Sequence, residues 1–155
     1  MTIRRAEEQD KQGILRLLAQ VNNLHASGRP DLFKAGERKY TEPQLNDIIR
    51  NDEKPIFVAA DDNNLYGYCF CVKEQYDGND NMVKRTTLYI DDLCVDESHR
   101  GEHVGRSLYD HVVKYAREAG CYNVTLNVWE CNPSARRFYE KMGLKPYKTG
   151  MEVIL

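Results

Sequence analysis

The sequence has little of what marks membrane, secreted or nucleic-acid-coating proteins. No apolar run approaches the roughly 18 residues that a bilayer-spanning helix needs, so we expect no membrane segment. The first residues, Met1 to Arg5, lead directly into charged positions without an apolar signal region, so secretion is not expected. The 24 acidic and 22 basic residues leave a net charge of −2, whereas a protein that coats nucleic acid is usually clearly basic.

Cysteines are few and show no metal-binding pattern. The five thiols contain no C-x-x-C pair and no nearby histidine at zinc-site spacing, so we expect no metal. An odd number of scattered thiols is typical of reduced cysteines in the cytoplasm, where disulfides are rare, and we expect that location. The five are Cys69, Cys71, Cys94, Cys121 and Cys131.

The length and the hydrophobic pattern predict one α/β domain. A chain of 155 residues has the usual size of a single domain, and we expect residues 1–155 to share one core. Periodicity and turn residues predict the order β-α-α-β-β-β-α-β-α-β. The predicted strands are 3–6, 56–60, 65–72, about 85–95, 122–129 and a final strand or hairpin over 147–155. The predicted helices begin after the N-caps Asp10 and Thr41, near Val104 and after the N-cap Asn132.

The chemically informative segment follows the predicted strand that ends at Val95. The residues Arg100-Gly101-Glu102-His103-Val104-Gly105-Arg106 lead from a tight turn into a helix. Helix N-termini offer unpaired N–H groups and a partial positive charge, glycines allow close approach, and arginines add charge-assisted bonds. This combination favours pyrophosphate binding. A purely structural turn is the alternative, and this segment alone does not decide between them.

Two segments together resemble the GNAT superfamily of acyl-CoA-dependent N-acyltransferases. The stretch from Arg100 to Gly105 is similar to the motif Q/R-x-x-G-x-G/A, and the stretch from Asn132 to Leu144 is similar to N-x-x-A-x-x-F-Y-x-K-x-G-F. The predicted element order also fits, so the resemblance covers essentially the whole chain. It implies a mostly antiparallel sheet with a splayed central parallel strand pair. It also implies acetyl-CoA as co-substrate, direct transfer to a primary amine of a small molecule or peptide, and a homodimer.

The resemblance further assigns the residues that hold acetyl-CoA. The backbones of Leu93, Cys94 and Val95 would bond pantetheine, while the loop residues Arg100, Gly101, Glu102, His103, Val104, Gly105 and Arg106 would hold the pyrophosphate, with Asn132 and Tyr139 completing the set. His103 stands where the motif has its first glycine. A Cβ there is tolerable only if the backbone avoids positive φ, and we expect the imidazole to point outward.

Tyr139 and Asp91 are the predicted catalytic residues. By resemblance, Tyr139 hydrogen-bonds or protonates the departing CoA thiolate; a free thiol has a pKa of about 8.5 and a phenol about 10, so the tyrosine still carries its proton when the thiolate leaves. The alternative is an ordinary helix aromatic beside Phe138. The segment from Tyr89 to Leu93 is similar to the Glu-Asp pair of polyamine-acetylating relatives, which points to Asp91 as the base. Neighbouring strand residues face opposite sides, so only one of Asp91 and Asp92 should face the substrate, unless both are solvated or structural.

Other residues bear on specificity without naming a substrate. The loop after the first helix brings His25, Arg29, Asp31, Phe33 and Tyr40 near the acceptor by resemblance. Arg29 and His25 could meet an anionic group or face solvent. Asn127 stands where relatives that acetylate ribosomal protein N-termini carry Glu, which argues against that class. Cys94 is not expected to be a nucleophile, because no histidine is placed to activate it.

Two non-enzymatic classes compete with the acetyltransferase. The first is a regulatory module that binds acyl-CoA without turnover. The second is a nucleotide-binding module, which is disfavoured because the chain has neither G-x-x-x-x-G-K-[ST] nor a complete G-x-G-x-x-G.

Overall fold

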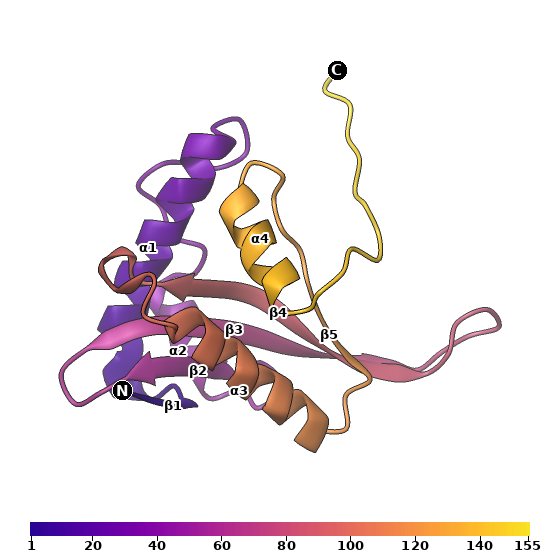
Figure 1. The fold of residues 1–155 in the computed structure, drawn as a ribbon, viewed down its shortest axis with the longest axis horizontal. Coiled ribbons are helices and arrows are strands. Elements are labelled where there is room, and N and C mark those ends of the chain that lie inside the picture. Colours follow the sequence, from indigo (N-terminus) through magenta and orange to yellow (C-terminus); the bar gives the residue numbers. More distant parts are fainter.

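A single twisted sheet organises the computed structural model, which describes residues 1–155 in full (Figure 1). Its strands lie side by side in chain order: β1 (Thr2–Arg5), β2 (Ile56–Ala60), β3 (Leu65–Tyr76), β4 (Arg85–Val95) and β5 (Asn123–Leu126). The first four are antiparallel neighbours, and β5 runs parallel to β4. The predicted α/β fold with a mostly antiparallel sheet and one parallel pair is confirmed.

Helices cover both faces of this sheet. They are α1 (Lys11–Gly28), α2 (Glu42–Ile49), α3 (Val104–Glu118) and α4 (Pro133–Lys141), with 3-10 turns at Glu8–Asp10 and Glu97–His99. The core beneath α1 and α2 includes Ile14, Leu18 and Phe70. The opposite core lies beneath α3, whose buried residues recur every four positions: Val104, Leu108, Val112 and Ala116. That spacing gives α3 one apolar stripe, which the sequence pattern predicts.

All three predicted N-cap positions are confirmed, and two of them carry a side-chain cap. Thr41 and Asn132 each accept the N–H group three residues later, at the starts of α2 and α4. Asp10 is the N-cap residue of α1, but its side chain caps no N–H group of that helix. Its buried carboxylate instead accepts the Glu7 N–H at 2.8 Å and pairs with Arg4 at 2.7 Å. A buried carboxylate needs a charged partner, and Arg4 on β1 supplies it.

A β-bulge reverses the faces of β4 at Asp91. Phe70 on β3 pairs with Asp92, but Cys71 pairs with Ile90, so Asp91 is an extra residue. Consequently Cys94 belongs to the core under α1, whereas Ile90 belongs to the core under α3, although both have even numbers. A bulge therefore separates the two halves of this strand.

The parallel pair separates at the same point. β5 pairs with β4 only from Thr87 to Ile90, whereas β4 continues to Val95. From Asp91 to Val95, β4 is bonded to β3 alone. The predicted splay of the two parallel strands therefore begins at the bulge.

The predicted final strand over residues 147–155 is absent. Residues Lys145 to Leu155 make no backbone hydrogen bond, and Figure 1 shows this yellow segment leaving the body of the molecule. The element order is therefore β-α-α-β-β-β-α-β-α, and the parallel pair lies at the sheet edge, not at its centre. An alternating pattern predicts strand propensity, but a strand forms only where a neighbour completes its ladder.

Two other strands differ in length from the prediction, and β1 lies one residue earlier than predicted. β5 is shorter than the predicted 122–129, since β4 and β5 diverge after Leu126. β3 continues four residues beyond the predicted end, to Tyr76, because it pairs with β4 as far as Arg85. None of the helices combines the length and the apolar character that crossing a membrane requires.

Candidate active site

The turn between β4 and α3 is built on two left-handed residues. Gly101 has φ +86° and His103 has φ +62°, and His103 is the one residue other than glycine with positive φ. The condition for an unstrained Cβ at this position, a backbone that avoids positive φ, is therefore not met. The imidazole is solvent-exposed, in line with the outward direction expected for it. Histidine is among the residues enriched in this region, yet a Cβ there still carries strain.

This turn presents free main-chain donors at the start of α3. The N–H groups of Val104, Gly105 and Arg106 donate to no backbone carbonyl, and no side chain caps them. Arg100 and Arg106 are both exposed on the same segment, as is Glu102. Unpaired N–H groups, the helix dipole and two guanidinium groups form an anion site suited to a pyrophosphate.

A buried carboxylate fixes the approach to this turn. Asp96 ends β4, pairs with Arg16 of α1 and accepts the Ser98 N–H at 3.1 Å. Burial alone would raise the pKa of Asp96, but the hydrogen bonds from Arg16 and Ser98 outweigh it and lower that pKa to about 2. The sequence analysis did not single out this pair, because the two residues lie 80 positions apart.

The splayed end of β4 supplies a free strand edge. Leu93, Cys94 and Val95 pair with β3 on one side and have no β5 partner on the other. The Cys94 side chain is buried, and its Sγ contacts the Leu17 carbonyl at 3.8 Å. Burial raises the pKa of Cys94 to about 12, so the thiol stays protonated at neutral pH and is a poor nucleophile.

α4 places Tyr139 beside the gap between the splayed ends of β4 and β5. Phe138 packs edge-on against Tyr139 at 5.0 Å, and its ring lies 3.4 Å from where a Cβ on Gly105 would stand. Phe138 thus packs α4 against the N-terminal turn of α3 at Gly105. Tyr139 is half-buried, and burial, together with the nearby Cys69 and Asp92, raises its pKa. The phenol therefore remains a hydrogen-bond donor.

Two adjacent carboxylates lie at the bulge, each with its own donors. Asp91 accepts the Tyr40 hydroxyl at 2.6 Å and forms an ion pair with Lys39 at 2.8 Å. Asp92 accepts the Tyr68 hydroxyl at 2.8 Å. The Asp91 charge is therefore partly neutralised by a lysine, whereas Asp92 has only a neutral hydroxyl as its hydrogen-bonded side chain.

Both carboxylates contact the same aromatic cluster. Tyr40 stacks on Phe70 at 5.3 Å, and Phe70 meets Tyr68 edge-on at 5.0 Å. The tyrosines at the two ends of this cluster bond Asp91 and Asp92 respectively. The expectation that only one of these aspartates faces this side is wrong, because the bulge breaks the alternation on which it rested.

The environment of Asp92 favours its protonated form. Burial raises the pKa of Asp92 to about 6, and the charge of Asp91 adds to this, whereas Tyr68 and Lys39 act in the opposite direction. A carboxylate with a pKa near neutrality is suited to accept and release protons in catalysis.

The cationic side chains predicted near the acceptor are engaged. Arg29 pairs with Asp31 at 2.8 Å and with Glu152 at 2.5 Å. His25 packs against Phe33 at 5.1 Å, and burial lowers its pKa, so the imidazole is neutral at pH 7. The structure therefore leaves neither side chain as a free cation for an anionic group.

The loop between β5 and α4 completes this side. Asn127 donates from Nδ2 to the Tyr89 hydroxyl at 3.3 Å. Trp129 meets Phe33 edge-on at 5.3 Å, which joins this loop to the loop between α1 and α2. Aromatic groups from two loops far apart in sequence are thus in contact.

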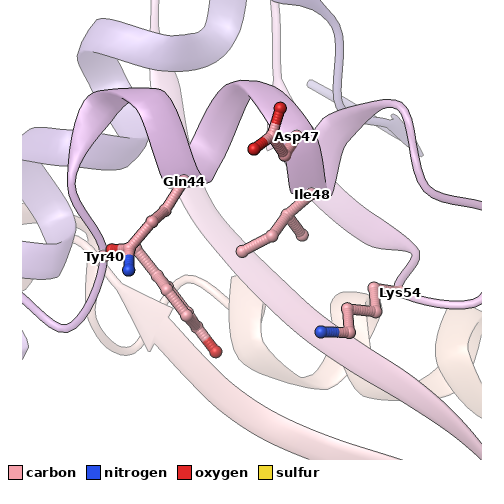
Figure 2. Close-up of a pocket in the computed structure, with 5 residues that line it drawn as sticks. All are labelled: Tyr40, Gln44, Asp47, Ile48 and Lys54. Atoms are coloured by element: carbon pink, nitrogen blue, oxygen red, sulfur yellow. The ribbon is translucent and has the colours of Figure 1, made fainter.

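A separate open pocket of about 230 Å³ lies beside α2 (Figure 2). It is lined by Tyr40, Gln44, Asp47, Ile48 and Lys54. Only Tyr40 also belongs to the carboxylate region, so this pocket adjoins the site without containing its chemistry. No group of three or more His, Cys, Asp or Glu side chains is arranged to hold a metal ion.

Comparison with known proteins gives the family of this chain. Residues 18–144 match the model of the acetyltransferase (GNAT) family. A probable glucosamine 6-phosphate N-acetyltransferase 2 from Oryza sativa subsp. japonica is 31% identical over 147 residues, which are 91% of this chain and 80% of that protein. The chain belongs to the GNAT family and is an N-acetyltransferase by class.

Solved structures agree with this fold. A crystal structure of a point mutant of the BH1408 protein from Bacillus halodurans has a TM-score of 0.95 and 29% identity, covering 100% of this chain and 99% of that one. An aminoglycoside N-acetyltransferase in complex with CoA has a TM-score of 0.74 at 14% identity, covering 99% of this chain and 98% of that one, so it supports the fold alone.

Replacing His103 by glycine tests the strain in the turn. We expect His103→Gly to stabilise the protein by about 1 kcal/mol, because glycine adopts the left-handed region without a Cβ clash. For a chain of this size that corresponds to a rise in Tm of roughly 2–4 °C, measurable by calorimetry. The matched control is His103→Ala, which keeps the Cβ and removes the ring. An equal Tm rise in both variants would show that the backbone conformation is not the cause.

Proposed function

We propose that this protein transfers the acetyl group of acetyl-CoA directly to a primary amine of a small molecule or peptide, with residues 1–155 acting as one domain. The observation that carries the proposal is the continuity of the site. The free edge of β4 runs from the carboxylates at Asp91 and Asp92 to the anion site at the start of α3. Tyr139 lies against the same gap. An extended thioester with a pyrophosphate at one end fits this geometry.

The main chain supplies most of the proposed acetyl-CoA contacts. Backbone groups of Leu93, Cys94 and Val95 are available on the side that β5 has left, and they suit the amides of pantetheine. The pyrophosphate would be held by the loop segment 100–106, chiefly through N–H groups at the start of α3. Asn132 is already committed to capping α4, so its role towards the cofactor is to fix the helix that carries Tyr139.

The carboxylate pair supports an amine as acceptor. An alkylammonium group has a pKa of about 10.4 and must lose a proton before its nitrogen attacks the thioester carbon. Asp92 is the better proton acceptor of the two, because its pKa is about 6 and Asp91 is already engaged by Lys39 and Tyr40. As the new C–N bond forms, the C–S bond breaks, and the thiolate receives a hydrogen bond or a proton from Tyr139.

The state of the five cysteines supports a proposal about the cellular compartment. None of the five cysteines forms a disulfide, although Cys69 and Cys71 have their sulfurs 3.7 Å apart. Free thiols at this separation support a reducing environment, and we propose a cytoplasmic location.

A panel of amines tests the function. The purified protein is incubated with acetyl-CoA and polyamines, aminoglycosides, amino acids or peptides, and free thiol is measured. We expect CoA release with at least one class. Acetyl-CoA binding without thiol release for any class would instead support the regulatory module, and no binding at millimolar acetyl-CoA would contradict both.

Removing the hydroxyl of Tyr139 tests whether this residue assists the departure of the CoA thiolate. We expect Tyr139→Phe to lower kcat by about 100-fold, the lower end of the usual contribution of a positioned acid. The dissociation constant of acetyl-CoA should change less than about threefold, since binding rests on main-chain groups. The matched control is Tyr76→Phe, whose hydroxyl contacts only Asn79. An unchanged kcat in Tyr139→Phe would show that this residue has only a packing role.

The pH dependence of kcat/KM distinguishes whether Asp91 or Asp92 is the base. If Asp92 accepts the proton, kcat/KM in the unmodified protein should rise as pH increases through about 6. Asp92→Asn should abolish this rise and lower kcat, whereas Asp91→Asn should weaken activity but keep the rise. The opposite pattern would assign the base to Asp91, the residue favoured by resemblance.

The Asp92→Asn substitution also changes the stability of the fold in a direction that can be predicted. The folded-state pKa of Asp92 lies above its unfolded value of about 3.9, so the ionised form destabilises the fold at pH 7. We expect Asp92→Asn to raise the free energy of unfolding by about 1–3 kcal/mol at pH 7, with little effect below pH 4. Denaturant unfolding at the two pH values measures this difference, and a loss of stability at pH 7 would contradict the assigned environment.

A further inference from the structure

The side chain of Lys39 reaches the carboxylate pair from the loop between α1 and α2. Its Nζ lies 2.8 Å from a carboxylate oxygen of Asp91 and 3.2 Å from the Asp91 carbonyl oxygen. Burial raises the pKa of Asp92 to about 6 and the Lys39 charge acts in the opposite direction, so the ammonium is also close enough to act on Asp92. A primary alkylammonium group therefore already lies where the proposed reaction needs one.

No other lysine is placed in this way. The remaining lysines that form ion pairs do so with glutamates outside the site: Lys11 with Glu8, Lys73 with Glu53 and Lys114 with Glu118. Lys34 lies in the same loop as Lys39, but its side chain is exposed and forms no ion pair. The loop thus contains one lysine held at the carboxylates and one free lysine for comparison.

Little besides the ion pair with Asp91 fixes the Lys39 ammonium. No backbone group of residues 37–40 takes part in a backbone–backbone hydrogen bond. The Lys39 side chain is 42% exposed, whereas that of Asp91 is 17% exposed. An ion pair with an exposed partner is weak, so the amine can leave Asp91 and shift along the free edge of β4 without disturbing the rest of the fold.

We propose that Lys39 is acetylated by its own chain when acetyl-CoA is bound and no acceptor is present. The inference rests on the proposed acetyl transfer and adds a modification site to it. The Lys39 ammonium loses one proton to Asp92, and its nitrogen then attacks the thioester carbon. The N–C bond forms as the C–S bond breaks, and the thiolate takes a proton from Tyr139. Tyr139 regains a proton from the new amide nitrogen and Asp92 releases its proton to solvent, so the products are acetyllysine, CoA thiol and one proton.

Acetylation of Lys39 would change the site that takes the acceptor. An acetylated lysine nitrogen is neutral, so its ion pair with Asp91 is lost. Asp91 and Asp92 would then lie side by side without the cation that now pairs with one of them. The modification therefore makes the charge at the acceptor site depend on whether an acceptor is available.

Peptide mass spectrometry of the purified protein, incubated with acetyl-CoA and no amine, tests the site. We expect one acetyl group per chain on Lys39, formed roughly tenfold or more faster than on Lys34, because a positioned amine needs no bimolecular encounter. The rate at Lys39 should be independent of protein concentration, since the amine and the carboxylates belong to one chain. Equal rates at the two lysines, or a rate that grows with protein concentration, would overturn the proposal.

The Tyr139→Phe variant separates catalysed from spontaneous acetylation. We expect it to slow the acetylation of Lys39 by about 100-fold, because the departing thiolate loses its proton donor. The slow background reaction at Lys34 should be unchanged and serves as the internal standard. The same Lys39 rate in Tyr139→Phe and in the unsubstituted protein would show that the modification is spontaneous, which contradicts the proposal.

The coupling between Lys39 and the carboxylates can be measured without acetyl-CoA. Lys39→Gln replaces the ammonium by a neutral amide, as acetylation does. Because the Lys39 charge lowers the pKa of Asp92, the fall in the free energy of unfolding that begins near about pH 4 should continue to a higher pH in Lys39→Gln. The same substitution in an Asp92→Asn background should produce no such difference. Identical pH profiles with and without Lys39 would place its ammonium outside the site and overturn the inference.

Self-acetylation and the proposed function fail in different ways. If an amine of the panel is acetylated while Lys39 stays unmodified, self-acetylation alone is refuted. If acetyl-CoA modifies neither Lys39 nor any amine, the proposed acetyl transfer is contradicted as well.

Discussion

The insertion of one residue at Asp91 is the constraint on which the rest of the site depends. It reverses the faces of β4, so that Cys94 enters the core under α1 while Ile90 enters the core under α3. It coincides with the last pair between β4 and β5, so the strand edge beyond it is free. It also brings two neighbouring carboxylates to one aromatic cluster. A regular strand would have sent Asp91 and Asp92 to opposite faces.

The electrostatics at the bulge follow from that geometry. Two adjacent carboxylates repel, and the structure separates their roles by giving Asp91 the cation Lys39 and leaving Asp92 with the neutral Tyr68. Burial, with the nearby Asp91 charge, disfavours the ionised form of Asp92 and raises its pKa to about 6. Apolar packing in the two cores, one on each face of the sheet, offsets the resulting loss of folding free energy. Such a destabilised group is typical of a site arranged for chemistry more than for stability.

Local patterns in the sequence were sufficient for much of the fold. The four-residue spacing in α3, the caps at Thr41 and Asn132, and the turn ending at Gly105 are each encoded within a few positions. The bulge was not predictable, because it depends on the register between β3 and β4 and not on any residue type. The partners of Asp91 come from a loop 51 and 52 positions away, and no short-range pattern reveals such contacts.

The missing strand shows a different limit of prediction. Residues 147–155 alternate as a strand does, yet strand formation needs a partner that the single chain does not provide. The splay of β4 and β5 also leaves β5 only four paired positions, all on one side. A strand so weakly held is a poor wall for a binding site unless something supports its outer edge. Any ligand held against β5 at the splayed end of β4 would therefore also stabilise this short strand.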